Sequence, residues 1–350
     1  MKPYLTITAA VLIIYSFSIY LYTQKIDRYD QLFSFASLFQ EIGSPESTRP
    51  AIKNLSIATK KAEIKPIKLL VTGDIMLGRY VNVLTSNKNN FSWPYQKTAE
   101  LLNSADLTFI NLESPLIANC PLTSEGMIFC GNLQHAPALA KTGVDIASVA
   151  NNHAENKGTA GLSETIEILQ ENNIAAIGVK DEENLVREIN GAKYAFLAYN
   201  DVETANQKKV KNVDLNIVRA EIAAADKLAD AVIIMFHWGN EYTHKPTARQ
   251  IEIAHAAIDA GADLVLGNHA HWVQIMEQYK DRLIMYSHGN FVFDQNWSRK
   301  TSEGVIGLYQ MKGEELLDYQ FISVIIEHNS QPRLATENES EAILKNITGQ

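Results

Sequence analysis

Cysteine is nearly absent from this chain, which has only Cys120 and Cys130 among its 350 residues. A zinc site built on these two cysteines alone would be incomplete. Both residues lie in a segment that also holds proline, glycine and serine, NCPLTSEGMIFCGN. If this segment lies outside the cytoplasm, we expect a disulfide that closes the loop, and two unpaired thiols are the alternative.

Basic residues are also in deficit, since 31 Lys and Arg stand against 40 Asp and Glu, for a formal net charge of -9. A nucleic-acid-binding surface needs clustered Lys and Arg, so this composition argues against nucleic acid as a partner. An anionic substrate is still compatible, because a bound cation can outweigh the surrounding field locally. The chain is otherwise of ordinary globular composition, 46% hydrophobic and 20% charged.

Charge is missing altogether from residues 5–22, LTITAAVLIIYSFSIYLY. A helix of roughly 20 apolar residues crosses a bilayer, and the tyrosines at both ends suit its interfaces. No small-x-small cleavage site follows, so we expect residues 1–24 to form an uncleaved transmembrane anchor. Basic residues lie on both sides of the span, and charge alone therefore does not orient it. We expect the C-terminal domain to be extracytoplasmic, from the cysteine argument and from the resemblance described below.

The segment that follows, residues 25–66, has two parts. Residues 30–43 place apolar side chains on one helical face, while residues 44–66 carry three prolines among Ser, Thr and Lys, which is typical of a linker. The helix would lie at the membrane surface or pack on the main domain, and the sequence leaves both open. The remainder, 67–350, is predicted to form one α/β domain.

Short apolar segments alternate with helical patterns throughout this domain, which predicts an α/β layered fold. The β-branched-rich segments predict buried strands at 67–72, 107–110, 145–150, 231–236, 263–266 and 282–287. Apolar residues at helical spacing predict helices at 161–173 and 247–262.

Each predicted strand ends in polar residues. They are Gly73-Asp74, Asn111-Leu112-Glu113, Asn151-Asn152-His153, His237-Trp238-Gly239, Gly267-Asn268-His269-Ala270-His271 and His288-Gly289-Asn290. Ligands of α/β folds collect beyond the carboxyl ends of the strands, where the loops diverge. We therefore expect these six strand ends to meet in one crevice.

Imidazole, carboxylate and amide oxygen together are typical ligands of divalent ions such as Mn, Fe and Zn. On an extended segment His269 and His271 would point to the same side. Asp74 supplies a negative charge, and Glu113 has the two oxygens needed to bridge two ions. Such ions activate water and stabilise charge on an attacked centre. Taken singly, each motif is as typical of a turn, a helix cap or a packed histidine, and only their joint placement indicates metal.

The ordered motifs GDIMLGR, NLESPL, VANNH, HWGNEY, GNHAHWVQ and YSHGNFVFDQ closely resemble those of the CapA/PgsA family of poly-gamma-glutamate capsule synthesis proteins. That family is related to the calcineurin-like metallophosphoesterases. The match runs from residue 68 to about residue 346. The resemblance implies a four-layer α-β-β-α fold, a dinuclear metal centre, and a membrane-anchored protein whose domain faces outward.

The resemblance also implies roles for single residues. His153 takes the catalytic or substrate-facing position, and Arg79 is placed to clamp an anionic group. Glu241, Tyr242 and Asn290 would line the same mouth and contact substrate. The implied metal ligands are Asp74, Glu113, Asn152, His237, His269 and His271.

The sequence departs from the family pattern at four places. Met76 stands where calcineurin-like enzymes have a histidine, and Asn156 where relatives have an acidic residue. His288 replaces a leucine and would add a ligand or pack, and Ala270 replaces a proline.

Two functions follow from these residues. The first is a metal-dependent hydrolase that acts outside the membrane on a phosphoester or an anionic polymer, with His153 as acid or electrostatic stabiliser. The second is a non-catalytic, polymer-binding subunit that works with other proteins of a capsule synthesis or export complex. The ligand set supports the first, while Met76 and Asn156 favour the second.

Overall fold

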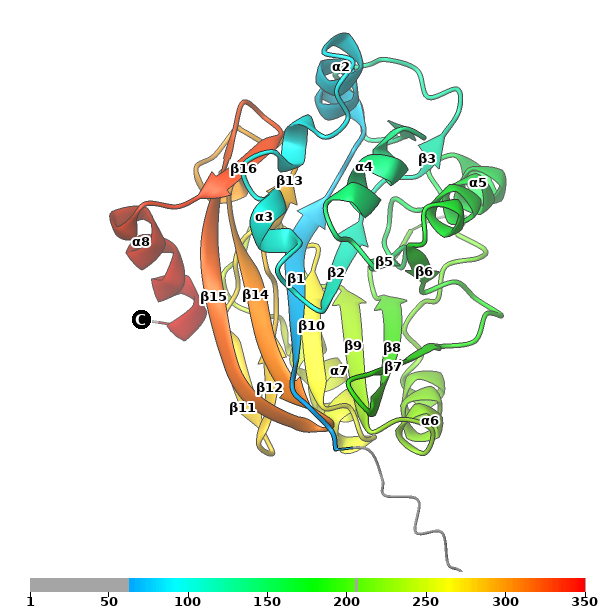
Figure 1. Cartoon of the computed structure of the whole chain (residues 1–350), viewed down its shortest axis with the longest axis vertical. Coiled ribbons are helices and arrows are strands. Elements are labelled where there is room, and N and C mark those ends of the chain that lie inside the picture. Colours follow the sequence, from blue (N-terminus) through cyan, green and yellow to red (C-terminus); the bar gives the residue numbers. More distant parts are fainter. Residues whose placement is uncertain (1–62, 205–206, 350) are drawn as a thin grey trace, which may run out of the picture. The chain divides into compact units, whose positions relative to one another are not determined.

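The structure is a computed structural model, and it describes residues 63–204 and 207–349 (Figure 1). The predicted transmembrane segment and the predicted helix at 30–43 lie outside the described residues. Among the helices that the structure does describe, none combines the length and apolar character that crossing a bilayer requires.

Two mixed β-sheets form the centre of the fold. The first has the order β16 (Gln331–Leu334), β15 (Glu315–Glu327), β14 (Glu303–Lys312), β1 (Ile67–Ile75), β2 (Leu107–Leu112), β5 (Ile146–Ser148) and β6 (Ala175–Ile177), with β13 (Asn290–Val292) paired to the end of β1. The second has the order β11 (Met276–Tyr279), β12 (Arg282–Met285), β10 (Leu264–Asn268), β9 (Ala231–His237), β8 (Ala192–Asn200) and β7 (Leu185–Ile189). A separate short pair joins β3 (Leu116–Ile117) to β4 (Gly131–Asn132).

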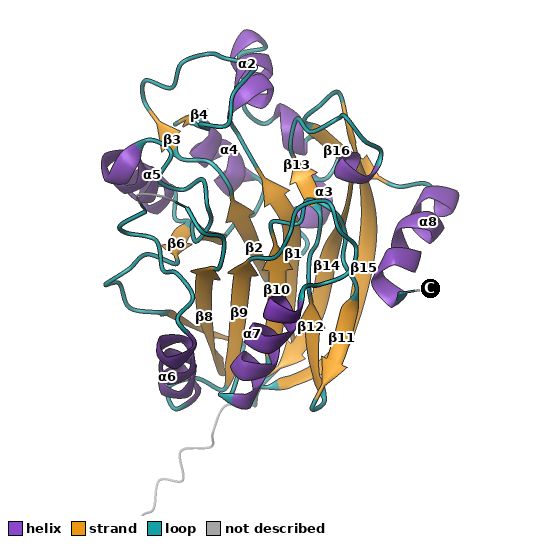
Figure 2. Cartoon of the chain, turned by 180° about the vertical axis from the view of Figure 1, so that it is seen from behind, coloured by secondary structure: helices purple, strands orange, loops and turns teal. Residues whose placement is uncertain are grey.

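Helices lie outside the two sheets (Figure 2). They are α2 (Arg79–Asn87), α3 (Ala99–Leu102), α4 (His135–Lys141), α5 (Gly158–Glu171), α6 (Leu215–Asp226), α7 (Ala248–Asp259) and α8 (Glu337–Thr348), with 3-10 turns η1 (Trp93–Tyr95) and η2 (Lys300–Ser302).

Alternation along the strands of the second sheet shows how the layers arise. On β9, Ile233 and Met235 belong to the main core, whereas Ile234 and Phe236 pack with α6 and α7 on the other face. The ring of Phe196 on β8 meets the ring of Phe109 on β2 edge to face at 5.8 Å. The two sheets therefore pack face to face, α6 and α7 cover the outer face of the second sheet, and α4 and α5 contribute to the main core from the side of the first sheet.

The predicted α/β class is confirmed, and all six predicted strands and both predicted helices are present. The strands divide between the sheets, with β1, β2 and β5 in the first and β9, β10 and β12 in the second. Within each sheet these strands are parallel. In Figures 1 and 2 the arrowheads of β1, β2, β9 and β10 point to the same end of the molecule, so their carboxyl ends lie together.

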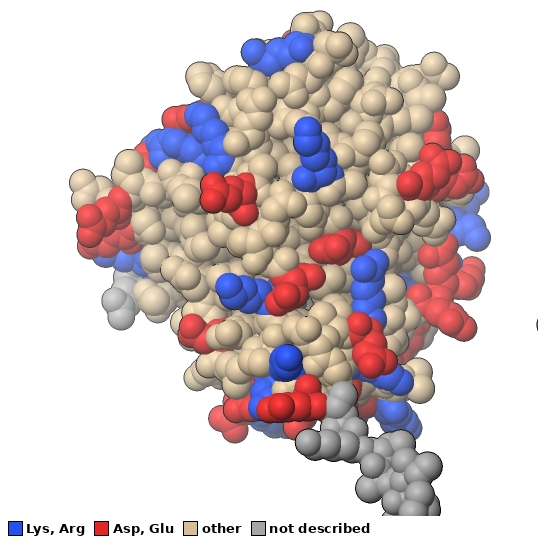
Figure 3. All heavy atoms as spheres, viewed as in Figure 1, with Lys and Arg blue, Asp and Glu red and all other residues tan. Residues whose placement is uncertain are grey.

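Charged side chains of both signs are interspersed on the face shown in Figure 3. No continuous basic patch is visible on that face.

Candidate metal centre

The carboxyl ends of both sheets contribute side chains to one buried cluster. Asp74 lies near the end of β1 and Glu113 directly follows β2, both in the first sheet. His237 ends β9, and His269 and His271 follow β10, both in the second sheet. Two sets of three residues could each hold an ion, and within each set the ligand atoms all lie within 4.8 Å of one another. The sets share His271: one is Asp74, Glu113 and His271, and the other is Glu241, His269 and His271.

Glu113 is the central residue of this cluster. Its side chain is fully buried, and neither carboxylate oxygen has a hydrogen-bond partner among the described residues. Its Oε1 lies 3.9 Å from Nε2 of His153, 4.0 Å from Nε2 of His237 and 3.8 Å from Nε2 of His271. These separations are too long for hydrogen bonds and suit ligand atoms that share a cation.

Burial raises the pKa of the Glu113 carboxyl well above its ordinary value, and the charges of Asp74 and Glu241 raise it further. A buried carboxylate without a donor is costly unless it is neutralised or paired. A divalent cation beside Glu113 would remove that cost, so the residues present fit a metal site.

Asp74 is held in place by two donors. Its Oδ1 accepts a hydrogen bond from Nδ2 of Asn111 at 2.7 Å, and its Oδ2 accepts one from the backbone N–H of His269 at 3.2 Å. The same Oδ2 lies 3.2 Å from Nδ1 of His271. Asp74 of the first sheet therefore contacts both His269 and His271 of the second sheet.

His237 connects the remaining predicted ligands. Its Nε2 lies 2.8 Å from Oδ1 of Asn152 and 3.1 Å from Nδ1 of His269. Burial lowers the pKa of His237 well below its ordinary value and the pKa of His269 to about 3, with further lowering from neighbouring histidines. Both imidazoles are therefore neutral near neutral pH, which is the form that binds metal. All six predicted ligands gather at this centre, and their role as ligands stays a prediction.

The prediction that His269 and His271 lie on an extended segment is wrong. Their φ angles are 90° and 54°, a conformation that residues other than glycine seldom adopt. The chain bends after β10, and the bend, not strand alternation, brings both side chains to the centre. Backbone strain of this kind persists where surrounding contacts impose it, here including the bond from the His269 N–H to Asp74.

His153 faces the cluster, whereas Arg79 is already paired. The Arg79 guanidinium forms an ion pair with Asp294 through Nη2 and donates from Nη1 to the Gly126 carbonyl at 3.3 Å. Both terminal nitrogens are thus engaged by the protein, and the side chain is 8% exposed. The bidentate clamp predicted for Arg79 would require its release from Asp294. Burial lowers the pKa of His153 to about 4, so this imidazole is neutral near neutral pH.

The three residues predicted to contact substrate, Glu241, Tyr242 and Asn290, lie in different surroundings. Glu241 is partly exposed, and its Oε1 lies 4.0 Å from Nε2 of His271, within reach of the cluster itself. The ring of Tyr242 lies 6.1 Å from the ring of His271 and 6.2 Å from that of Trp297, which is 59% exposed.

Asn290 is fully buried behind His271. Its Oδ1 lies 2.9 Å from Nδ1 of His271, and its Nδ2 donates to Gln295 and to the Thr301 carbonyl. With both ends of its amide engaged, Asn290 orients His271, and the structure gives it no contact surface for substrate.

Two of the departures from the family pattern, His288 and Met76, have partners within the protein. His288 is bonded on both nitrogens, at 3.1 Å to the Gly267 carbonyl and at 2.9 Å to the Tyr309 hydroxyl. It packs between the sheets, which was one of the two alternatives for this residue. The buried Met76 accepts the Gly78 N–H at 3.0 Å through its sulfur.

Sequence reasoning missed three residues that shape the centre. Asn111 bonds Asp74 and lies 3.2 Å from Nδ1 of His237, and its place at the end of a strand was a usable signal. Asp294, the partner of Arg79, is 215 positions away in sequence. Phe129 stacks on His153 with ring centroids 4.1 Å apart, and nothing in its local sequence marks it.

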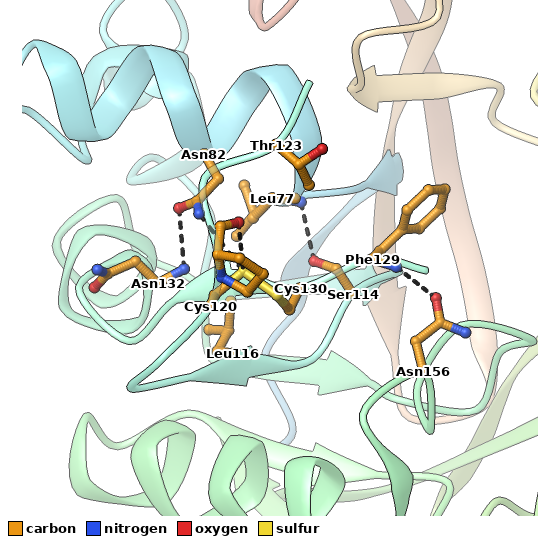
Figure 4. Close-up of a disulfide and its surroundings, with 12 residues drawn as sticks. Leu77, Asn82, Ser114, Leu116, Cys120, Thr123, Phe129, Cys130, Asn132 and Asn156 are labelled. Carbon is orange, nitrogen blue, oxygen red and sulfur yellow. Dashed lines mark hydrogen bonds between the residues drawn. A yellow bond between two sulfur atoms is a disulfide. The ribbon is translucent and has the colours of Figure 1, made fainter. Parts of the chain in front are cut away.

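Cys120 and Cys130 are joined in a disulfide whose Cα atoms lie 5.7 Å apart (Figure 4). This disulfide closes the loop between the two cysteines, as expected for a domain outside the cytoplasm. Asn82 on α2 holds the base of the loop, because its Oδ1 accepts the Asn132 N–H at 3.1 Å and its Nδ2 lies 3.6 Å from the Cys120 sulfur. The base of the loop is therefore fixed to α2.

Two glycines permit the close approach of these strand ends. A Cβ atom on Gly73 would lie 2.2 Å from the Gly289 carbonyl oxygen, where β1 passes the segment before β13. Gly239 has a φ of 86°, and a Cβ atom there would lie 2.3 Å from the Gln250 side chain. Glycine is thus required just before Asp74 and just after His237.

The sequence of this chain is similar to those of known bacterial proteins. The family model described as bacterial capsule synthesis protein PGA_cap matches residues 68–295. The capsule biosynthesis protein CapA of Bacillus anthracis is 27% identical over 308 residues, which cover 83% of this chain and 74% of the relative. The PGA biosynthesis protein CapA of Bacillus subtilis (strain 168) is 30% identical over 292 residues, which cover 79% of this chain and 74% of the relative.

Among solved structures, a phosphatase from Mycoplasma pneumoniae is similar with a TM-score of 0.51 and 13% sequence identity, over 79% of this chain and 97% of that chain. At this identity the likeness shows a shared α/β fold alone. The match of the family model over most of the described domain, together with the similarity to the Bacillus proteins, confirms the resemblance, and this chain belongs to the bacterial capsule synthesis protein PGA_cap family.

Proposed function

We propose that this chain is a metal-dependent hydrolase of capsule synthesis, which cleaves a phosphoester or a link in an anionic polymer such as poly-gamma-glutamate. The observation that carries the proposal is Glu113, a fully buried carboxylate without a hydrogen-bond partner among the described residues. Three imidazole nitrogens surround its Oε1 at 3.8–4.0 Å. Such a group is costly in a protein interior unless it is neutralised or paired, and a bound cation would pair it.

Two divalent cations fit the donor set better than one. The six predicted ligands and Glu241 are more donors than the four of a tetrahedral site, and each of the two candidate sets brings at least one carboxylate. Nitrogen and oxygen donors without cysteine suit Mn, Fe or Zn. When bound, such ions supply Lewis acidity and lower the pKa of water at the site. The residues that would hold them are Asp74, Glu113, Asn152, His237, His269 and His271, with Glu241 as a seventh candidate.

The remaining side chains would bind and orient the substrate. His153 presents Nε2 to the cluster, and in its neutral form this nitrogen would accept a proton or a hydrogen bond there. Tyr242 and the exposed Trp297 would form one wall of the entrance. Acidic side chains dominate the site, so an anionic substrate would depend on the cations for its attraction.

A non-catalytic, polymer-binding subunit is the alternative, and Met76 favours it. This thioether occupies the position of a histidine in calcineurin-like enzymes and bonds the backbone of Gly78. A centre with one imidazole fewer would hold one ion less tightly. In this alternative the cations bind polymer carboxylates without cleavage, and other capsule-synthesis proteins supply the chemistry.

We further propose that residues 5–22 anchor the protein in the cell membrane with the domain on the extracytoplasmic side. The disulfide between Cys120 and Cys130 supports this orientation, because disulfides persist in oxidising compartments. Membrane fractionation, followed by protease treatment of intact cells, tests it. A domain that stays protected inside intact cells would contradict the orientation.

The hydrolase proposal is tested with the full-length chain, stripped of metal and reloaded with Mn²⁺. Bound metal is measured by mass spectrometry, and cleavage is assayed on a phosphodiester and on poly-gamma-glutamate. We expect turnover that falls by about 100-fold or more in His269→Ala. The matched control is His255→Ala, since His255 lies on α7 and bonds Glu277, with no place in either candidate ion group. Bound metal without turnover on either substrate would favour the accessory role.

A further inference from the structure

The loop closed by Cys120 and Cys130 lies directly against the metal centre. Arg79 donates to its Gly126 carbonyl at 3.3 Å, and the Arg79 guanidinium carbon lies 4.8 Å from the ring centre of Phe129. The same Phe129 ring stacks on His153 at 4.1 Å with an interplanar angle of 28°. One side chain of the loop therefore contacts both residues that the sequence marked as catalytic.

Asn156 adds a polar connection at the same place (Figure 4). Its Oδ1 accepts the backbone N–H of Phe129 at 2.7 Å. A backbone N–H can only donate, so this contact fixes which end of the Asn156 amide faces the loop. The oxygen, and not the amide nitrogen, must lie there.

The same oxygen lies 2.9 Å from Nδ1 of His153. An oxygen that only accepts requires a donor on its partner, so Nδ1 of His153 must carry a hydrogen. The neutral imidazole then has no hydrogen on Nε2, and Nε2 is the atom that lies 3.9 Å from Oε1 of Glu113. A chain of contacts thus runs from the loop backbone through Asn156 to the nitrogen that faces the candidate ion centre.

We infer that Asn156 is a positioning residue that couples the disulfide loop to His153, fixing the imidazole tautomer so that its bare Nε2 faces the metal centre. In this chain the asparagine thereby provides an acceptor where relatives carry an acidic side chain. The consequence for turnover rests on the proposed hydrolase function, whereas the tautomer of His153 does not.

The tautomer is tested directly by NMR of the full-length chain labelled with [¹⁵N]histidine, which distinguishes a nitrogen that carries hydrogen from a bare one. His153→Gln identifies the signal, and spectra are recorded without metal and with added Zn²⁺, a diamagnetic ion. We expect Nδ1 of His153 to carry the hydrogen in the unaltered chain. In Asn156→Leu without metal, the signal should move toward a mixture of tautomers, and Asn156→Asp, which keeps an acceptor oxygen, should restore it.

The coupling to the loop is tested with Cys120→Ser/Cys130→Ser. We expect this double variant to show the same mixture of tautomers, with circular dichroism and thermal unfolding reporting whether the fold is kept. A hydrogen on Nε2 of His153 in the unaltered chain, or a folded Asn156→Leu variant with an unchanged signal, would overturn the inference. An unchanged signal in the folded double variant would overturn the coupling to the disulfide.

Turnover provides the second readout. In the Mn-loaded protein, Asn156→Leu should lower kcat by about 10- to 100-fold with little change in KM, and Asn156→Asp should recover most of it. Asn103→Leu is the matched control, since Asn103 is exposed and bonds the Ala99 carbonyl in α3. If even the unaltered chain shows no turnover, the hydrolase proposal fails, while the NMR result still decides the role of Asn156. Equal kcat in Asn156→Leu and the unaltered chain would contradict the positioning role.

Discussion

A single buried side chain, Glu113, carries the proposal of a metal centre in this structure. Its carboxylate has histidines and Asp74 as neighbours and no donor among the described residues. Ordinary folding would select against such a group, because an unsatisfied buried polar atom costs about 1–3 kcal/mol. A bound cation would remove this cost.

Glu113→Gln tests this explanation. The substitution keeps the size of the side chain and removes its charge, so metal affinity should fall by about 10-fold or more. The metal-free variant should unfold at the same temperature as the metal-free unaltered chain or at a higher one, since the buried carboxyl is gone. Isothermal titration with Mn²⁺ and thermal unfolding measure the two effects. Unchanged affinity together with a lower unfolding temperature would indicate a purely structural role.

The sequence predicted the residue types at this centre but not all of their tasks. Asp74, Glu113 and the histidines were identifiable because each follows a strand pattern that is local in sequence. The pairings of Arg79 with Asp294 and of His271 with Asn290 were not predicted, because only the folded sheets bring these residues together. Local periodicity likewise gives no warning of the positive φ angles at His269 and His271.

At the scale of elements, the connections between the two sheets decide whether their strand ends stay together. His288, just before β13, bonds the Gly267 carbonyl of β10 in the second sheet and the Tyr309 hydroxyl of β14 in the first. His288 is fully buried, and its two bonds connect β10 of the second sheet to β14 of the first. The sequence predicted strands and their polar ends, whereas their division between two sheets depends on long-range pairing with β8 and β14, which those motifs do not encode.

His288→Leu places the family's usual residue at this position and removes both bonds. Two buried polar groups then lose a partner, so the free energy of unfolding should fall by about 1–3 kcal/mol. Metal content should stay the same, because His288 lies in neither candidate ion group. Denaturant unfolding and metal analysis measure these quantities, and Tyr309→Phe in the same chain should return part of the loss. Reduced metal content would mean that His288 is a ligand.

Glu327 at the end of β15 links three segments and predicts a pH dependence. It bonds Lys97 at 2.6 Å and Arg333 of β16 at 2.8 Å, and these bonds lower its pKa from 4.5 to about 2. A depressed folded-state pKa contributes stability that is present above 4.5 and is lost as the pH falls toward 2. Thermal unfolding between pH 5 and pH 2 should show a shallower loss in Glu327→Gln than in the unaltered chain. Glu171→Gln, at the end of α5, is the control, and equal slopes for Glu327→Gln and the unaltered chain would contradict the link.

At the scale of the whole molecule, negative charge would oppose the binding of an anionic substrate unless cations are bound at the candidate centre. The chain carries a formal net charge of -9, and the centre itself gathers Asp74, Glu113 and Glu241. A metal-free centre of this kind repels anions, so both catalysis and polymer binding would require bound metal.

Metal should therefore stabilise the folded chain by mass action. A ligand at 100 times its dissociation constant adds about 2.7 kcal/mol to the free energy of unfolding. Differential scanning fluorimetry should show a rise in Tm with Mn²⁺ and its reversal by chelator, and the rise should shrink strongly in Glu113→Gln. A Tm that does not respond to Mn²⁺, Fe²⁺ or Zn²⁺ would count against a metal centre in the folded chain.

The most direct test of the shared ion centre is anomalous X-ray scattering from a crystal of the Mn-loaded protein. We predict peaks within roughly 2.0–2.3 Å of Glu113 and of Nε2 of His271, the distance at which such ligands bind divalent metal. Scattering found only at the protein surface, with the space between Glu113 and the histidines occupied by water or side chains, would contradict the central claim.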